Sequence, residues 1–196
     1  QFARRFASLD HLTHGRIGWN IVTGYLDSAQ RLIGENGLKD HDLRYEQAEE
    51  FLQLCYKFWE GSWEDNAVLK DKQNRIFTDP AKVHQINHQG QFYRSQGVFQ
   101  VSPSVQRTPV LFQAGASPRG MAFATQHTEG MFIGGDHPDK IKKQVDQIRR
   151  QATEQGRDPE AIKIFVGITV VTAATDELAQ QKLDEYRAYA SPEAGL

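Results

Sequence analysis

Three short segments carry polar side chains where a small ligand could bind, and the most informative is QAGASPRG, residues 113–120. Gly115 lets the backbone turn tightly after an apolar segment. Ser117 and Pro118 are typical first residues of a helix, so the N–H groups of residues 116–120, Pro118 excepted, gather at its N-terminus. Together with the Ser117 hydroxyl they would form a cradle for a phosphate group. The alternative is an ordinary capped turn between a strand and a helix.

The second segment is HDLRY, residues 41–45. His41 precedes Asp42, the expected N-cap of a long helix, and Tyr45 lies in the first turn of that helix. Both side chains could face one rim, where a tyrosine ring gives a flat wall and a hydrogen-bonding group for an aromatic ligand. The alternative is that His41 is a surface residue and Tyr45 a hydrophobic staple at the helix start.

The third segment is GWNIVT, residues 18–23, in which Asn20 and Thr23 interrupt an apolar strand. A polar side chain near the end of a strand either binds a ligand or is a hydrogen-bonded core residue. A metal centre is not indicated. His84 and His88 have a spacing of four, but their β-like surroundings would separate them, and no carboxylate accompanies them as in the H-E-x-x-H motif.

Composition limits the classes of function. The chain has 196 residues, with 23 basic and 25 acidic residues well mixed and a net charge of -2. Such a balance argues against binding to nucleic acid or to a membrane surface. Cys55 is the only cysteine, so no internal disulfide forms, and we expect it to be a small buried side chain. There is no signal-peptide pattern, which predicts a cytoplasmic protein, and the start at Gln1 suggests that the natural N-terminus is missing.

The elements that must position these residues alternate between strand and helix. After the end of a helix at 2–9 and a loop at 10–15, apolar runs predict strands, and capped amphipathic runs predict helices. The strands are expected at 16–23, 109–115, 130–134 and 162–172, and the helices at 42–61, 117–128, from Asp136 or His137 to about 155, and from Thr175 onward. This order indicates parallel βαβ units. Ligands then bind at the carboxyl ends of the strands, so Thr23, Gly115 and Gly134 should surround a single mouth.

Residues 62–108 carry no helical period, and β-like pieces around Gly90 and Gly97 predict a hairpin. We interpret 62–108 as an insertion or lid-like segment, since long stretches of this kind often have a function. About four βα units are too few for a closed barrel, which needs eight strands and roughly 250 residues. The expected fold is therefore α/β: a single domain over 1–196 that is either a small open sheet or part of a TIM (β/α)8 barrel.

Several stretches occur in an order and spacing that resemble one family: ARRFASLDHLTHGRIGWNIVT, HDLRYEQAEEF, WEDNA, FTDPAKVHQINHQGQFY and PVLFQAGASPRG. They are similar to the two-component flavin monooxygenases related to nitrilotriacetate, dibenzothiophene-sulfone and pristinamycin-pathway monooxygenases. These enzymes belong to the bacterial-luciferase-like superfamily. The resemblance covers nearly the whole chain and is strongest from residue 3 to 120.

The resemblance implies a partial TIM barrel and an oxidoreductase that uses reduced FMN and O2 to oxygenate a small organic substrate. It implies a separate NAD(P)H-dependent flavin reductase as partner and a homo-oligomer in the complete enzyme. His41 and Tyr45 match family positions that contact the flavin, and Ser117, after the turn at Gly115, matches a position near the FMN phosphate. The family's other flavin contacts, an Asp and a Thr on earlier strands, have no counterpart here, so we expect the chain alone to bind flavin weakly or not at all.

Two alternatives remain open. The chain could be a truncated, non-catalytic remnant or interaction fragment of such a barrel. Its uncovered strand edges and inner face would then favour self-association. It could also belong to a deazaflavin-dependent oxidoreductase of the same superfamily, although the combination of HDLRY and QAGAS argues against this.

Overall fold

The computed structural model describes residues 1–115, 117–135 and 137–191, in two compact units, Gln1–Phe165 and Val166–Leu196. Asp136, one of two candidates to begin the helix expected to run to about residue 155, lies outside the described residues, as does position 116 in the expected phosphate cradle. The expectation of one domain over residues 1–196 stays a prediction.

A parallel sheet is the framework of the first unit, and its strands confirm the expected βαβ order. The strands lie side by side in the order β1-β6-β7-β8: β1 Gly18–Ile21, β6 Val110–Gln113, β7 Gly130–Ile133 and β8 Lys163–Val166. Gly18 pairs with Val110 and Ile21 with Gln113, so β1 and β6, far apart in sequence, end at the same level. Their carboxyl ends therefore stand next to each other.

The predicted strand over 162–172 is too long, because β8 ends at Val166. The side chains of Ile168 and Val170 beyond it are 77% and 69% exposed. A strand needs a neighbouring strand and a buried face to persist, and the described part of the second unit, which begins at Val166, contains no strand that could pair with this segment. The apolar composition of this segment therefore does not produce a strand.

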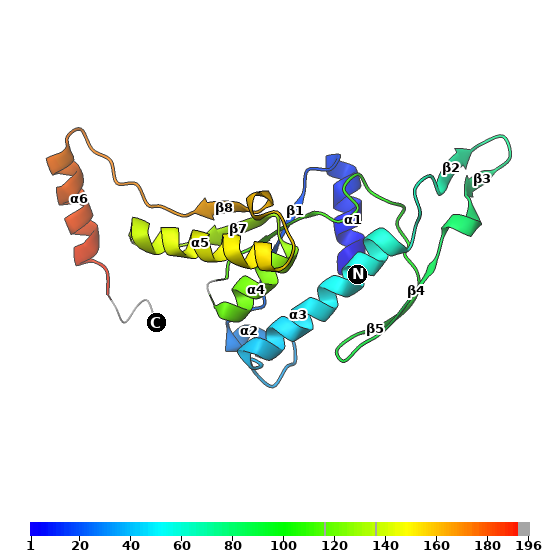
Figure 1. The fold of residues 1–196 in the computed structure, drawn as a ribbon, viewed down its shortest axis with the longest axis horizontal. Helices are drawn as coiled ribbons and strands as arrows, with labels where there is room; N and C mark the ends of the chain where they lie inside the picture. Colours follow the sequence, from blue (N-terminus) through cyan, green and yellow to red (C-terminus); the bar gives the residue numbers. More distant parts are fainter. Residues whose placement is uncertain (116, 136, 192–196) are drawn as a thin grey trace. The chain divides into compact units, whose positions relative to one another are not determined.

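Helices connect and flank these strands (Figure 1). They are α1 Phe2–Thr13, α2 Asp27–Leu32, α3 His41–Tyr56 with a π-helical extension Lys57–Gly61, α4 Pro118–His127 and α5 Pro138–Glu154, with short 3-10 turns at Pro80–Lys82 and Pro159–Ala161. In the second unit, Thr175 caps α6, Asp176–Ala188, by accepting a hydrogen bond from the Leu178 N–H at 3.3 Å. None of the helices in the described part of the chain has the length and apolar character needed to cross a membrane.

Two expected helix boundaries are wrong. The loop predicted from residue 10 is helical as far as Thr13, because the buried Asp10 accepts hydrogen bonds from Gln106, and the helix ends at His14 in the left-handed conformation. Asp40, not Asp42, caps α3, since its side chain accepts from the N–H groups of Asp42 and Leu43. His41 is therefore the first residue of α3 rather than a residue before the cap.

The helix-facing side of the sheet forms the core. Ile21 and Leu111 pack against Tyr45, Leu52 and Phe123 of α3 and α4. A second cluster joins α4 and α5 to β7 through Met121, Ala124, Met131, Ile133, Ile148, Ala152 and Ile162. Each large apolar side chain buried here stabilises the fold by roughly 1.5–3 kcal/mol relative to exposure. Cys55 is buried as expected, and burial raises the pKa of its thiol to about 12.

The opposite face of the sheet carries an aromatic row. It consists of Phe112, Phe132 and Phe165, whose ring centres lie 5.3–6.1 Å from one another. The side chains of Phe132 and Phe165 are each 44% exposed. The Phe112 ring packs against Gly130, where a Cβ would lie 2.5 Å from the ring atom Cδ1. In a closed barrel this face is the interior.

Residues 62–108 contain two antiparallel hairpins, one of which the sequence predicts. β4 Gln85–Gln89 pairs with β5 Arg94–Val98 around a turn that begins at Gly90, and β2 Val68–Asp71 pairs with β3 Ile76–Thr78. Both hairpins lie on the other side of α3 from α4 and α5 (Figure 1). The lid-like role of residues 62–108 stays a prediction.

Candidate functional site

A cavity of about 260 Å³ lies at the carboxyl ends of β1 and β6. The first turns of α3 and α4 complete its wall. Its lining includes all four candidate residues, together with Thr23 and other residues of the two strand ends: Ile21, Val22, Thr23, Gly24, Tyr25, His41, Arg44, Tyr45, Gln113, Ala114, Gly115 and Ser117. The geometry thus brings together the segments 21–25, 41–45 and 113–117, the first and last of which are about 90 residues apart in sequence, as expected where parallel strands end side by side.

Tyr45 is buried at this cavity and held by several contacts. Its side chain is 5% exposed, and its ring lies 5.8 Å from that of Phe123 and 5.1 Å from that of His41. Its hydroxyl oxygen accepts a hydrogen bond from Gln113 Nε2 at 3.0 Å. Because the oxygen is the acceptor in this bond, the hydroxyl proton remains available for a ligand.

Two glycines leave room for the Tyr45 hydroxyl. A Cβ on Gly120 would lie 2.6 Å from this oxygen, and a Cβ on Gly115 would lie 3.3 Å from it and 3.0 Å from Gln113 Nε2. A real Cβ does not approach an oxygen to 2.6 Å. Gly120 is therefore required by packing against Tyr45, while Gly115 keeps the turn after β6 close to the buried polar pair.

Ser117 caps α4, as predicted, but the cap reduces the expected phosphate cradle. Its Oγ accepts a hydrogen bond from the Gly120 N–H at 3.0 Å, and its carbonyl accepts from the Met121 N–H at 2.8 Å. The Gly120 amide is therefore not free for a phosphate, contrary to the expectation. Two donors remain available to a phosphate: the Ser117 hydroxyl and the Arg119 backbone N–H, which lies in the first turn and so has no acceptor inside the helix.

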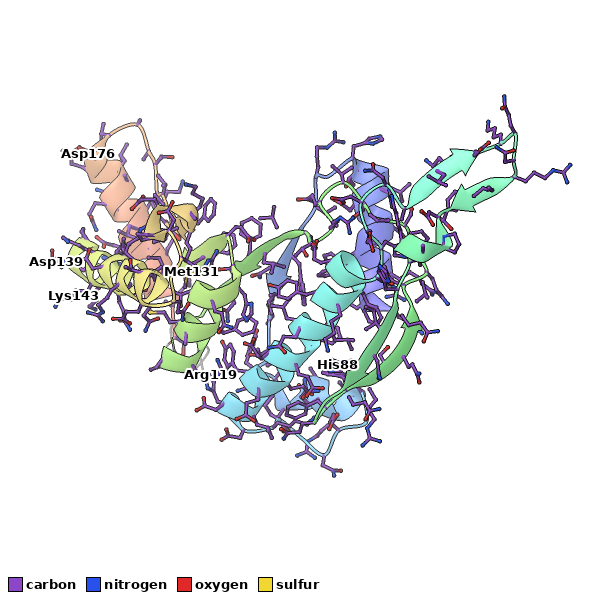
Figure 2. The ribbon with its side chains drawn as sticks, turned by 45° about the vertical axis from the view of Figure 1, so that its right-hand side comes forward. His88, Arg119, Met131, Asp139, Lys143 and Asp176 are labelled. Atoms are coloured by element: carbon purple, nitrogen blue, oxygen red, sulfur yellow. The ribbon has the colours of Figure 1, made fainter. Side chains whose placement is uncertain are left out.

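Two arginines near the site were not predicted from the sequence. The Arg119 guanidinium lies 5.8 Å from the centre of the Tyr45 ring, at the start of α4 (Figure 2). Arg44 lines the cavity and donates to the Gly24 carbonyl. Both arginines lie within motifs that the sequence had already singled out. A positive charge beside an expected phosphate cradle is the feature of the sequence that could have identified them.

Asn20 is not part of this cavity. It is in register with Phe112 and lies on the opposite, barrel-interior face of the sheet, whereas Thr23 lines the cavity. His41 lines the cavity too, with its Nδ1 2.7 Å from Asp42 Oδ1. Of the polar residues predicted on the strand 16–23, the structure brings only Thr23 to the site, and Thr23 lies beyond the end of β1.

His84 and His88 serve separate partners. Nε2 of His84 lies 2.6 Å from Glu64 Oε1. His88 is 6% exposed and lies between α3 and the β4–β5 hairpin, with Nε2 3.1 Å from Glu50 Oε1 and Nδ1 3.2 Å from Lys57 Nζ (Figure 2). Within the described residues no cluster of three or more His, Cys, Asp and Glu could hold a metal ion.

A second cavity of about 330 Å³ adjoins the first and shares Ile21, Val22, Thr23 and Arg44 with it. Its floor is formed by Phe2, Trp19 and Phe51, and Tyr93 brings the tip of the β4–β5 hairpin to its wall. Tyr93 is fixed there by a hydrogen bond from Gln47 Nε2 at 3.0 Å. The hairpin thus contributes directly to the surroundings of the site.

Comparison with known proteins gives consistent matches over nearly the whole chain. The chain is 50% identical over 194 residues to long-chain alkane monooxygenase of Geobacillus thermodenitrificans and 50% identical to dimethyl-sulfide monooxygenase of Hyphomicrobium sulfonivorans. These alignments cover 99% of this chain but only 44% and 40% of the relatives. A crystal structure of a riboflavin lyase with modified FMN matches with a TM-score of 0.90 and 48% identity, covering 98% of this chain and 43% of that one.

The chain therefore spans less than half the length of these relatives, which fits a partial barrel. Relatives named for nitrilotriacetate, dibenzothiophene sulfone and pristinamycin IIA also match, which confirms the resemblance seen in the sequence. The model of one family, the luciferase-like monooxygenases, matches residues 1–195. The chain belongs to the luciferase-like monooxygenase family.

Proposed function

We propose that the whole protein is an FMN-dependent monooxygenase that receives reduced flavin from a separate NAD(P)H-dependent reductase. One observation carries the proposal: His41, Tyr45, Gly115 and Ser117, which come from separate segments, line a single cavity. Related proteins named as an FMNH2-dependent dimethylsulfone monooxygenase and as component A of a nitrilotriacetate monooxygenase support the cofactor and the reductase partner.

The residues present suit the phosphate end of FMN. The Ser117 and Tyr45 hydroxyls supply neutral donors, and Arg119 supplies a positive charge at a helix N-terminus, which itself favours anions. The ring of His41 beside Tyr45 gives a partly apolar wall next to these donors. Such a set holds a phosphate by hydrogen bonds and charge.

Bound reduced FMN would supply the electrons that activate O2, so that one oxygen atom enters the substrate and the other leaves as water. The protein's task is to bind, orient and exclude water. Tyr45, enclosed by Gln113, Gly115 and Gly120, is rigid enough to orient a ligand. The adjoining cavity, with its apolar floor, is where we place a small organic substrate.

Flavin binding and oxygen incorporation by the whole protein test the proposal. We expect FMN to quench tryptophan fluorescence in a saturable manner. With a reductase, NADH and ¹⁸O2, long-chain alkanes and dimethyl sulfide are the first substrates to try, and one labelled oxygen atom should appear in the product. Absence of saturable FMN binding would refute the proposal.

A non-catalytic fragment is the second candidate, favoured by the 44% exposure of Phe132 and Phe165 on the inner face of the sheet. Titrating the chain of residues 1–196 by itself with FMN separates the two. We expect weak or no binding by the chain and strong binding by the whole protein. If neither binds, the interaction fragment is the better account.

A further inference from the structure

The cavity at the carboxyl ends of β1 and β6 is lined by a buried amide whose hydrogen bonding is incomplete. Gln113, the last residue of β6, is 1% exposed. Its Nε2 donates to the Tyr45 hydroxyl at 3.0 Å, while its Oε1, which is buried, has no hydrogen-bond partner in the described part of the chain. A buried acceptor without a donor costs free energy, and an apolar side chain of similar size would avoid that cost.

Gln113 shares this condition with Arg44, whose buried Nε also lacks a partner among the described residues. Both residues line the same cavity. Two of the four buried side-chain atoms without a partner among the described residues therefore belong to this cavity, where a ligand could supply the missing hydrogen bonds.

The direction of the Gln113 bond decides what Tyr45 can do. A phenol donates one hydrogen bond, and its single proton cannot serve Gln113 and a ligand at the same time. With Nε2 as the donor, the Tyr45 oxygen is the acceptor and its proton can point at an anion. With an acceptor in place of Nε2, the proton would be drawn away from the cavity.

We propose that Gln113 is a positioning residue for phosphate recognition: its amide orients the Tyr45 hydroxyl so that this group donates to the phosphate of FMN. The inference rests on the proposed function. Gly115 and Gly120 support the arrangement, because a Cβ at either position would press on the Tyr45–Gln113 pair. Gln113 acts through Tyr45 and needs no contact with the flavin.

The test compares FMN with riboflavin, which lacks the phosphate, as ligands of the whole protein. We expect Gln113→Met to weaken FMN binding roughly tenfold, which is the loss of about one charge-assisted hydrogen bond, and to leave riboflavin affinity unchanged. Gln113→Glu should weaken FMN binding further, because a carboxylate can only accept from Tyr45 and also repels the phosphate. Retained riboflavin binding also shows that each variant is folded.

A double-mutant comparison shows whether Gln113 acts through Tyr45. In a Tyr45→Phe background, Gln113→Met should have no further effect on FMN affinity. Gln151 is a matched control, since its amide oxygen is also buried without a partner in the described residues but lies on α5, outside the cavity lining. We expect Gln151→Met to change neither affinity.

Three results would overturn the inference. Equal losses for FMN and riboflavin in Gln113→Met would mean that the residue supports the whole site. Unchanged FMN affinity would mean that Tyr45 needs no orientation, and additive losses with Tyr45→Phe would mean that Gln113 acts independently. By contrast, a wild-type protein that binds neither flavin would refute the proposed function, and the inference with it.

Discussion

Ser117 has two tasks that one substitution can separate. As the N-cap of α4 it holds the Gly120 N–H, and as a hydroxyl in the cavity it can donate to a phosphate. The first task affects folding and the second affects binding. A cap elsewhere in the chain that has only the first task gives a control.

Ser117→Ala should lower the free energy of unfolding by about 1 kcal/mol, as lost N-caps do, and weaken FMN binding by the whole protein. Thr175→Ala, which removes the cap of α6, should destabilise that helix without changing FMN affinity. Thermal unfolding and fluorescence titration measure the two effects. Equal FMN affinity in both variants would exclude Ser117 from phosphate binding.

Gly120 tests the rigid placement of Tyr45. In Gly120→Ala the new Cβ would lie 2.6 Å from the Tyr45 oxygen, so the ring must shift. We expect a loss of about 1–3 kcal/mol of stability, typical of overpacking, and weaker FMN binding. Gly61→Ala is the control, because its nearest contact, Ile86 Cδ1 at 3.7 Å, is an ordinary one. Similar affinities in the two variants would contradict the account.

The residues of the site were only partly predictable. His41, Tyr45, Gly115 and Ser117 could be named because they lie in short motifs at helix starts and a strand end. The Gln113–Tyr45 hydrogen bond could not be predicted, since it joins residues separated by 68 positions and depends on how α3 packs against β6. Nor could the sequence show that the Ser117 hydroxyl takes the Gly120 N–H that a phosphate would otherwise use.

At the scale of elements, the β4–β5 hairpin is attached to α3 by one carboxylate. Glu50, 14% exposed, accepts from the N–H groups of Phe92 and Tyr93 at 2.9 and 2.7 Å and contacts His88. A Cβ on Gly90 would collide with this carboxylate, so the close approach needs glycine. The hairpin tip, which forms one wall of the adjoining cavity, is therefore held by Glu50.

This attachment should depend on pH. Burial alone would raise the pKa of Glu50, but the hydrogen bonds from Phe92, His88 and Tyr93 outweigh it and hold the pKa below its ordinary value of 4.5. A lowered pKa in the folded state means that the contribution to stability is present above the ordinary pKa and is lost as the pH falls through the folded one. The tip should therefore be held at neutral pH and released in acid.

Amide hydrogen exchange at Phe92 and Tyr93 measures this release. We expect strong protection in the wild type at pH 7, reduced protection in acid below pH 4.5, and reduced protection at both pH values in Glu50→Gln. Glu46→Gln, on the exposed side of the same helix, is the control and should behave as the wild type. Full protection in Glu50→Gln would show that other contacts hold the hairpin.

The elements themselves were more predictable than the site. Strands β1, β6 and β7 and the caps of α4 and α6 follow from local apolar runs and from Ser117 and Thr175. The end of β8 and the length of α1 do not, because the first depends on a missing neighbouring strand and the second on the contact between Asp10 and Gln106. Asp40 and Asp42 are equally good capping residues by type, and only the backbone geometry identifies Asp40 as the N-cap of α3.

At the scale of the whole molecule, the aromatic face of the sheet shows what a complete barrel must cover. Phe132 and Phe165 are packed on one side by each other and by Phe112, and are open on the other. Exposed apolar surface of this kind favours association. The length of the relatives, more than twice that of this chain, is enough to supply the missing strands.

The chain of residues 1–196 by itself should therefore self-associate through this face. We expect Phe132→Ser combined with Phe165→Ser to shift the chain toward monomer in analytical ultracentrifugation. Phe77→Ser on β3 is the control, since Phe77 is 58% exposed but lies in the hairpin region. If only the Phe77 variant became monomeric, the hairpins rather than the sheet would mediate the contact.

The most direct test of the central claim is a crystal structure of the whole protein with FMN bound. The account predicts that one FMN lies in the cavity at the ends of β1 and β6, with its phosphate within hydrogen-bond distance of the Ser117 and Tyr45 hydroxyls and with His41 beside the same molecule. An FMN bound elsewhere, touching none of these three residues, would contradict it.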